Sequence, residues 1–226
     1  MKRFNQTLRT SSWTLSDTST SLRLGTSGEI VTLRVMLVVY LIGNWATFAS
    51  ADVPLDAAQL RRLKAGEVVI DVRPDPQGAT GLITATIDIA TPPRELWAIM
   101  LDCARSQRVT SNLKSCRVLE QSADGLSDVR EHVVQWIWPL PSVRSVFASQ
   151  YRPFEQINFQ RVEGDLKFLE GTWRLEPLLQ GRATRLSYVA RITPGWPVPA
   201  ALVRSAIEAD MPRTLTALRR EATGRE

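Results

Sequence analysis

The most constraining stretch of the sequence is Leu82–Asp102, where a strand pattern passes directly into a helix pattern. Its first half carries apolar residues at every second position, at Ile83, Ala85, Ile87 and Ile89. Such alternation is typical of a strand with one buried face. Pro92 and Pro93 follow and suit the first turn of a helix, because that turn leaves their missing amide hydrogens unused. We therefore expect a strand and then a helix, running through Trp97, that packs on the same sheet.

Turn residues divide most of the remaining chain into short strand-like segments. Val68–Val72 alternates and is separated from Leu82–Ala90 by the turn residues of Pro74–Gly78, which predicts a hairpin. Six further strands are predicted: Cys116–Gln121, Asp128–Trp138, Val143–Arg152, Gln156–Val162, Phe168–Pro177 and Thr184–Thr193. Consecutive strands with short links favour an antiparallel meander.

Helical patterns stand at both ends of this strand region. Leu55–Lys64 predicts a short helix that Gly66 ends. Val198–Glu221 predicts a long amphipathic helix, kinked at Pro212. Its expected apolar face consists of Leu202, Ala206, Ala209, Leu215 and Leu218. The order of elements indicates an α+β fold in which a curved antiparallel sheet wraps around the C-terminal helix and encloses a cavity.

Alternation within the predicted strands assigns aromatic residues to the inner face. Trp173 and Tyr188 should point inward because charged residues occupy the alternate positions of their strands. Similar reasoning places His132 with Trp136 and Trp138 on one face, and Ser145 with Phe147 and Tyr151 on one face. The candidate ligand-binding residues are therefore Trp136, Trp138, Phe147, Trp173 and Tyr188. The alternative is that these aromatics simply fill the core.

An empty interior would be expensive for a domain of this size. Ligand pockets start at about 300 Å³, and an empty apolar cavity costs about 24 cal/mol per Å³. The resulting cost of roughly 7 kcal/mol is comparable with the whole stability of a domain. Either a ligand fills the space or side chains close it.

The N-terminal segment has the composition of a leader. Residues 1–33 are rich in Ser and Thr and are expected to be disordered. Arg34 then precedes the apolar run Val35–Ile42 and the sequence Ala49-Ser50-Ala51, which together indicate a signal peptide over 34–51, cleaved after Ala51. An uncleaved leader that anchors the chain, a buried helix and a later translation start near Val31 or Leu33 are the alternatives. The mature chain would then comprise a short helical segment, 52–66, and one domain, 67–223.

Charge and cysteine content bear on partners and compartment. The formal net charge is +5, but most of this excess belongs to the first 51 residues, and the remainder is close to neutral. Nucleic-acid binding is not expected, because phosphate affinity requires clustered Lys and Arg. Cys103 and Cys116 are the only cysteines. In a periplasmic or secreted protein they favour a disulfide, worth roughly 3 kcal/mol, over two unpaired buried thiols.

Catalytic and metal-binding patterns are missing from the sequence. His132 is the single histidine, so it is interpreted as a structural residue rather than a catalytic base. No Cys and His cluster suits a metal, and no glycine-rich phosphate or dinucleotide loop suggests a cofactor. The carboxylate pairs Glu163 with Asp165 and Glu170 with Glu176 are interpreted as solvated. We name no catalytic residue, metal or cofactor.

Several motifs together resemble a known superfamily. They are the pattern of Ile, Pro and Trp residues in Ile87–Trp97, the run Asn112–Leu119, Gly164-Asp165, Gly171–Leu175 and Asp210-Met211-Pro212. They resemble the START-like (SRPBCC) superfamily, in its polyketide cyclase and coenzyme Q-binding branch, over roughly 67–223. The resemblance implies a helix-grip fold and a hydrophobic ligand such as a lipid, quinone or polyketide. The leader and the cysteine pair depart from cytosolic and mitochondrial relatives, which argues against a direct quinone-chaperone role.

The resemblance implies binding without catalysis as the main function. The alternatives are a cyclase or aromatase that uses Tyr188 or Ser145, and an envelope interaction module with a vestigial cavity. The turn at Trp138–Ser142, the turn at Glu163–Lys167 and the link Pro194–Pro197 should cluster, because alternate connections of a meander lie at one end. Trp138 and Trp196 would then flank the cavity mouth and contact a membrane surface transiently, or merely plug that end.

Overall fold

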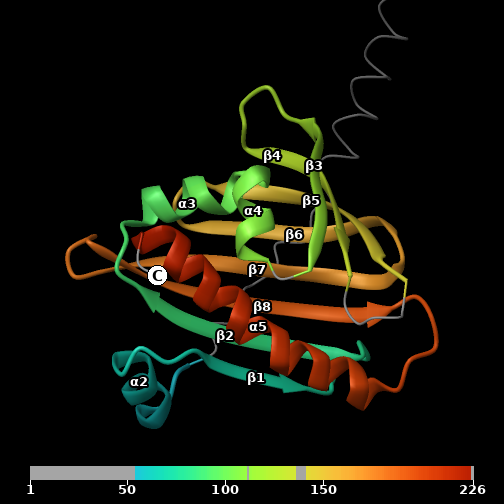
Figure 1. The fold of residues 1–226 in the computed structure, drawn as a ribbon, viewed down its shortest axis with the longest axis horizontal. Coiled ribbons are helices and arrows are strands. Elements are labelled where there is room, and N and C mark those ends of the chain that lie inside the picture. Colours follow the sequence, from blue (N-terminus) through green and yellow to red (C-terminus); the bar gives the residue numbers. More distant parts are fainter. Residues whose placement is uncertain (1–53, 111, 136–140, 225–226) are drawn as a thin grey trace, which may run out of the picture. The chain divides into compact units, whose positions relative to one another are not determined.

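Eight antiparallel strands form one curved sheet in the part of the chain that is described (Figure 1). The computed structural model describes residues 54–110, 112–135 and 141–224, all within the unit Ser50–Glu226. The strands are β1 (Val69–Arg73), β2 (Gly81–Ile89), β3 (Leu113–Gln121), β4 (Ser127–Val134), β5 (Val143–Arg152), β6 (Gln156–Gly164), β7 (Leu166–Leu178) and β8 (Ala183–Pro194). The helices are α2 (Ala57–Lys64), α3 (Pro93–Leu101), α4 (Cys103–Val109) and α5 (Ala200–Thr223).

The strand order β1-β2-β8-β7-β6-β5-β4-β3 confirms the predicted hairpin and meander. Among the described residues strand β1 pairs only with β2, and β3 to β7 each pair with the next strand along the chain. Strand β8 closes the arrangement by pairing with β2 as well as β7. In this register Tyr188 lies opposite both Ala85 and Trp173, so the two predicted inward aromatics are neighbours on adjacent strands.

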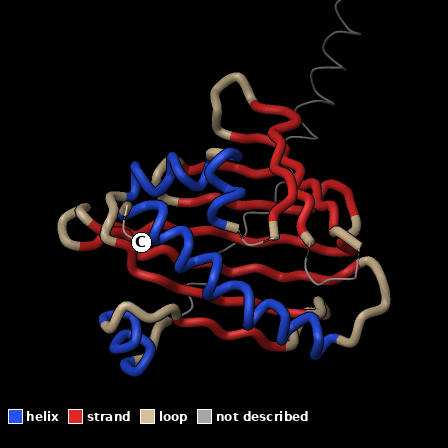
Figure 2. The backbone as a smooth tube through the Cα atoms, in the orientation of Figure 1, coloured by secondary structure: helices blue, strands red, loops and turns tan. Residues whose placement is uncertain are grey.

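Helix α5 lies across one face of the sheet, and the main core lies between them (Figures 1 and 2). It packs on β1 and β2 and also contacts α3 and α4. Ile87 on β2, Leu186 on β8 and Leu215 on α5 are completely buried in this core. The fold is therefore the predicted helix-grip arrangement, held by apolar residues that alternate along the strands and recur along the helix.

The buried face of α5 differs from the expected one at its first turns. Val203, Leu215 and Leu218 are its buried residues, whereas Leu202 is 47% exposed and Ala209 is also exposed. The prediction was wrong for Leu202 and Ala209, because helical spacing does not say which side of an amphipathic stripe meets the sheet. Pro212 lies inside the continuous helix; the expected kink there stays a prediction.

Helix α3 begins as predicted, and α4 was not expected. Pro92 is the N-cap residue of α3 and Pro93 its first residue. Helix α4 starts directly afterwards because the Asp102 carboxylate accepts a hydrogen bond from the backbone N–H of Ala104 at 2.8 Å. This capping aspartate was the sequence signal for α4.

Two of the three loops expected to cluster are joined by Asp165. Its backbone N–H donates to Arg144 O at 2.8 Å, and its carboxylate accepts from Arg144 N at 2.7 Å. Its carbonyl accepts from Gly195 N at 2.9 Å, which links the β6–β7 turn to the segment before α5. Gly164 allows this close approach, because it has a φ of 107° and a Cβ there would collide with Arg144 O. The third loop lies largely outside the described residues.

Candidate functional site

Two cavities lie between the sheet and its helices. One, of about 140 Å³, is lined by residues of α3, α4 and α5 and of β4 to β7, among them Leu101, Val109, Ile157 and Leu218. The other, of about 170 Å³, is lined by α5 residues such as Ile207 and Met211, by Ile83 of β2, and by Tyr188 and Ile192 of β8. We call them the α4 cavity and the α5 cavity. Both have mainly apolar linings, as binding sites for hydrophobic molecules do.

A connected set of aromatic rings links the lining of one cavity to the lining of the other. Phe147, Phe159 and Trp173 line the α4 cavity, and Tyr188 lines the α5 cavity. The ring centroids of Trp173 and Tyr188 are 4.2 Å apart, and those of Phe159 and Tyr188 are 6.0 Å apart in a stacked arrangement. Phe147 continues the set at 6.1 Å from Phe159. We call this set, which connects the linings of the two cavities through ring contacts, the aromatic partition.

Three of the five predicted ligand-binding residues thus come together. Phe147, Trp173 and Tyr188 belong to the aromatic partition, although a role in ligand binding stays a prediction. Phe159 joins them and was missed, although its alternate position in the predicted strand Gln156–Val162 was the available signal. Trp136 and Trp138 lie outside the described residues.

Strand β4 places three ionisable residues on its inner face, two of which sequence reasoning missed. Asp128, Arg130 and His132 alternate along the strand, and Arg130 and His132 line the α4 cavity. The period of two that placed His132 inward also places Arg130 and Asp128 there. That signal was present in the sequence, but charged residues are ordinarily assigned to the solvent face.

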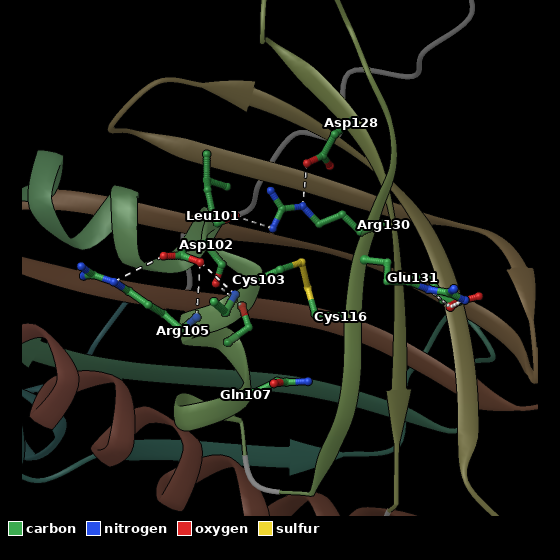
Figure 3. The surroundings of a disulfide bond; sticks show 12 residues. Leu101, Asp102, Cys103, Arg105, Gln107, Cys116, Asp128, Arg130 and Glu131 are labelled. Carbon is green, nitrogen blue, oxygen red and sulfur yellow. Dashed lines mark hydrogen bonds and ion pairs between the residues drawn. A yellow bond between two sulfur atoms is a disulfide. The ribbon is translucent and has the colours of Figure 1, made fainter.

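Arg130 is almost fully enclosed and paired. Its Nε donates to Asp128 Oδ2 at 2.6 Å, and its Nη1 donates to the backbone carbonyl of Leu101 at 2.9 Å (Figure 3). The side chains of Arg130 and Asp128 are 9% and 1% exposed. Removing either partner would leave an uncompensated buried charge, which is strongly unfavourable. The other carboxylate oxygen of Asp128, Oδ1, is buried without a hydrogen-bond partner among the described residues. Arg130 thereby connects the polar side of the α4 cavity to the end of α3.

His132 is uncharged at neutral pH. Burial lowers its pKa to about 4, and the nearby Arg130 guanidinium contributes to the lowering. Its ring packs edge-on against Phe147 at 4.9 Å between centroids. Its Nε2 atom is buried and has no hydrogen-bond partner among residues 54–110, 112–135 and 141–224. The expectation of a structural histidine therefore accounts for its packing but not for this unpaired nitrogen.

Two hydroxyl groups on β5 are also buried without a hydrogen-bond partner in the described part of the chain. They are Tyr151 Oη, in the α4 cavity, and Ser145 Oγ, on the residue paired with His132 across β4 and β5. Burial, and then the neighbouring Asp128 carboxylate, raise the pKa of Tyr151 well above its usual value. Burial likewise raises the pKa of Tyr188. Both phenols are protonated at neutral pH.

The disulfide predicted between Cys103 and Cys116 is present, with the two Cα atoms 5.3 Å apart. It joins the first residue of α4 to β3, beside the buried Arg130 (Figure 3). Because α4 contributes Ser106 and Val109 to the α4 cavity, the disulfide holds one wall of that cavity to the edge of the sheet.

The outer face of the sheet carries a third, larger cavity of about 310 Å³ under α2. Its lining mixes polar residues with apolar ones such as Leu55 and Val69 and also includes Tyr188; the polar residues include Thr84, Thr86, Arg174, Arg185 and Ser187. Arg185 makes two hydrogen bonds to the Asp88 carboxylate, at 2.8 and 2.9 Å. The hydroxyl groups and the ion pair of this outer cavity distinguish it from the two inner cavities.

Two of the four carboxylates considered as acid pairs have ion-pair partners. Glu163 pairs with Arg144 and Glu170 with Arg191, each at 2.7 Å. Asp165 binds the loop backbone as described above, and Glu176 is exposed. In the described segments no group of three or more His, Cys, Asp or Glu side chains could hold a metal ion.

Comparison with known proteins identifies the family. A family model described as polyketide cyclase / dehydrase and lipid transport matches residues 89–219, more than half of the chain. The chain belongs to this family. The matched residues extend from the end of β2 into α5. They include strands β4 to β8, which contribute lining residues to the two inner cavities. A search of proteins with curated functions found no match.

Solved structures in the polyketide cyclase and START group share the fold. A START superfamily protein from Mycobacterium smegmatis is 19% identical, with a TM-score of 0.56, covering 63% of this chain and 97% of that one. A STAR-related lipid transfer protein from Xanthomonas axonopodis is 15% identical, with a TM-score of 0.59, covering 69% and 93%. The Zhui aromatase/cyclase from Streptomyces sp. R1128 is 16% identical, with a TM-score of 0.53, covering 63% and 93%.

No helix among the described residues is long and apolar enough to cross a membrane. The predicted leader, 34–51, lies outside the described residues. Trp196 is half-buried and packs against the apolar cluster that contains Ile192 and Leu166.

Proposed function

We propose that the chain binds a hydrophobic small molecule, such as a lipid, a quinone or a polyketide-like compound, in its inner cavities and does not transform it. The observation that carries the proposal is the aromatic partition between the two cavities. Each cavity is smaller than the roughly 300 Å³ at which ligand pockets begin, but together they reach that size. Rotation of Tyr188 and Trp173 would join them into one apolar site.

Family membership supports the same conclusion, because the family is described by both cyclisation and lipid transport. The two buried phenols are protonated and the one histidine is neutral, so none of these groups is a strong base at neutral pH. Binding alone therefore fits the inner cavities better than proton abstraction.

Native mass spectrometry of the chain, purified gently from its own host, tests the proposal. We expect an added mass from a bound hydrophobic molecule. The variant Ala206→Leu fills the α5 cavity and should lose that mass, whereas Ala209→Leu, on the exposed face of the same helix, should keep it. Repeated spectra of the bare chain would overturn binding, and turnover of an added polyketide analogue would support the cyclase alternative instead.

We also propose that the protein works outside the cytoplasm. The predicted leader with its cleavage position after Ala51 supports export, and the disulfide between Cys103 and Cys116 suits an oxidising compartment. Mass spectrometry of the periplasmic or secreted fraction should find a chain that starts at Asp52 and has no reactive thiol. A chain that keeps its leader in the membrane fraction would support the anchored alternative, and two free thiols would contradict export.

A transient contact with a membrane surface through Trp138 and Trp196 is the proposed route of ligand exchange. The link that carries Trp196 is joined to the β6–β7 turn by the hydrogen bond from Gly195 to Asp165, at one end of the sheet. Flotation with anionic and zwitterionic liposomes should recover the wild-type chain and recover less of Trp138→Ala and Trp196→Ala. Lack of flotation with every lipid mixture would contradict this route.

A further inference from the structure

The α4 cavity is apolar on one side and polar on the other. Its polar side is formed by strands β4 and β5, which contribute Arg130, His132, Ser149 and Tyr151. The remaining lining residues are mostly apolar and come from Phe147 of β5, from β6 and β7, and from the helices, where the hydroxyls of Ser106, Thr110 and Thr214 are the exceptions. A molecule that fills this cavity meets hydrocarbon along most of its surface and hydrogen-bonding groups along one edge.

Two atoms on the polar side need a partner that the described residues do not supply. Tyr151 Oη and His132 Nε2 both belong to residues that line the cavity, and both are buried without a hydrogen bond of normal geometry in the described part of the chain, although the Asp128 carboxylate, whose Oδ1 atom is also unpaired there, lies near Tyr151 Oη. A buried polar atom without a partner is destabilising, so such atoms are normally satisfied by protein, water or ligand. Ser145 Oγ, next to His132 across the strand pair, has the same need.

The same side of the cavity carries no net charge. Arg130 is its charged lining residue, and the Asp128 carboxylate neutralises it at 2.6 Å while Leu101 O takes a second hydrogen bond. His132 is neutral at pH 7 because burial lowers its pKa to about 4. A ligand with an ionised group would bring an uncompensated charge into this enclosed space, which is strongly unfavourable.

We propose that the α4 cavity selects an uncharged hydrophobic ligand with a hydroxyl or carbonyl group, which Tyr151 and His132 bind by hydrogen bonds. This inference rests on the proposed binding function and restricts its substrate class. It excludes fatty-acid carboxylates and phosphate headgroups from the α4 cavity. Uncharged alcohols, phenols and ketones with a rigid apolar body remain.

Three fluorescent probes of nearly equal shape test the selection: 2-naphthol, 2-methylnaphthalene and 2-naphthoate. The oxidised wild-type domain at pH 7 should bind 2-naphthol about tenfold more tightly than 2-methylnaphthalene, because one net hydrogen bond is gained. Binding of 2-naphthoate should be the weakest. The Tyr151→Phe variant should bind 2-naphthol only as tightly as 2-methylnaphthalene, whose own affinity should not change.

Variants that remove one or both charges on β4 make the test sharper. Asp128→Asn leaves Arg130 uncompensated, so 2-naphthoate should become the preferred probe. The double variant Asp128→Asn with Arg130→Gln removes both charges and should return the preference to 2-naphthol. Glu176→Gln, exposed on the outer part of β7, is the control and should leave all three affinities unchanged. Where Asp128→Asn does not fold, the double variant and Tyr151→Phe decide the matter.

The outcomes separate this inference from the binding function. If 2-naphthoate or 2-methylnaphthalene binds the wild-type domain as tightly as 2-naphthol, the selection for an uncharged polar ligand is wrong and the binding function stands. If none of the probes binds and the native protein also carries no added mass, both proposals fail. Unchanged affinities in Tyr151→Phe and in the charge variants would show that the probes occupy another site, and would contradict the inference.

Discussion

The two sides of the protein interior treat their polar groups differently. On the side formed by β2, β8 and α5, the buried Thr184 hydroxyl donates to Thr91 O at 2.6 Å, and apolar side chains line the α5 cavity. On the side formed by β4 and β5, buried groups such as His132 Nε2 and Ser145 Oγ have no partner among the described residues. The first side satisfies its buried hydroxyl, whereas the second leaves buried polar groups unpaired within the described segments, which lowers stability.

The largest effect is expected on the apolar side. Leu215→Ala removes a completely buried side chain from the core and should lower the free energy of unfolding by about 4 kcal/mol. Leu202→Ala, on the 47% exposed face of the same helix, should change it by less than about 0.5 kcal/mol. Urea denaturation followed by circular dichroism measures both. Equal losses would mean that α5 does not hold the core.

The disulfide should contribute somewhat less, and on the opposite side. Replacing Cys103 and Cys116 together by Ser should lower the free energy of unfolding by about 3 kcal/mol, because the unfolded chain gains freedom. Dithiothreitol should lower the free energy of unfolding of the wild-type protein by the same amount and leave that of the double variant unchanged. An unaffected wild-type midpoint would show that the cross-link does not support the α4 cavity.

The neutral state of His132 predicts a pH dependence confined to the polar side. Its pKa is about 4 in the folded protein and near 6.5 in the unfolded chain, so the unfolded chain takes up the proton first as the pH falls. The stabilisation is complete above pH 6.5 and declines by about 3 kcal/mol between pH 6.5 and 4. Urea denaturation of wild type and His132→Phe across this interval isolates the effect. Parallel pH curves for the two proteins would contradict it.

The smallest expected changes in the free energy of unfolding have opposite signs on the two sides of the interior. Ser145→Ala removes a buried hydroxyl that has no described partner and should raise the free energy of unfolding by about 1 kcal/mol. Thr184→Val removes a buried hydroxyl that donates a hydrogen bond and should lower it by about 1 kcal/mol. Thermal denaturation distinguishes the two directions. A loss in both variants would mean that Ser145 has a structural partner after all.

Much of the fold could be predicted because the relevant signals are local. Apolar alternation and turn residues located the strands, and the short links between them implied the meander that β3 to β8 form. Every second connection of a meander lies at the same end of the sheet. The sequence therefore also predicted that the β6–β7 turn and the segment before α5 would meet, as Asp165 and Gly195 do. Helix α4 was missed because it has only seven residues and its signal is one capping aspartate.

The candidate site could be predicted only in its aromatic half. Trp173 and Tyr188 were predicted to point inward because charged residues flank them. Arg130 and Asp128 are themselves charged and were therefore not predicted to be buried. Their burial depends on a partner two positions away and on the carbonyl of Leu101, at the end of α3, which local patterns do not join to β4.

By itself the sequence determined the succession of strands and of the helices other than α4, the cysteine pairing and the inward direction of Phe147, Trp173 and Tyr188. Only the tertiary structure decided which side of α5 meets the sheet, and how aromatic rings from different strands link the linings of two cavities. It also decided that a buried ion pair without net charge, and buried polar groups without a described hydrogen-bond partner, lie along the β4 and β5 side of the α4 cavity. The reason is physical: periodicity reports which face of one element is apolar, whereas cavities and buried charges depend on how the curvature of the sheet brings distant elements together.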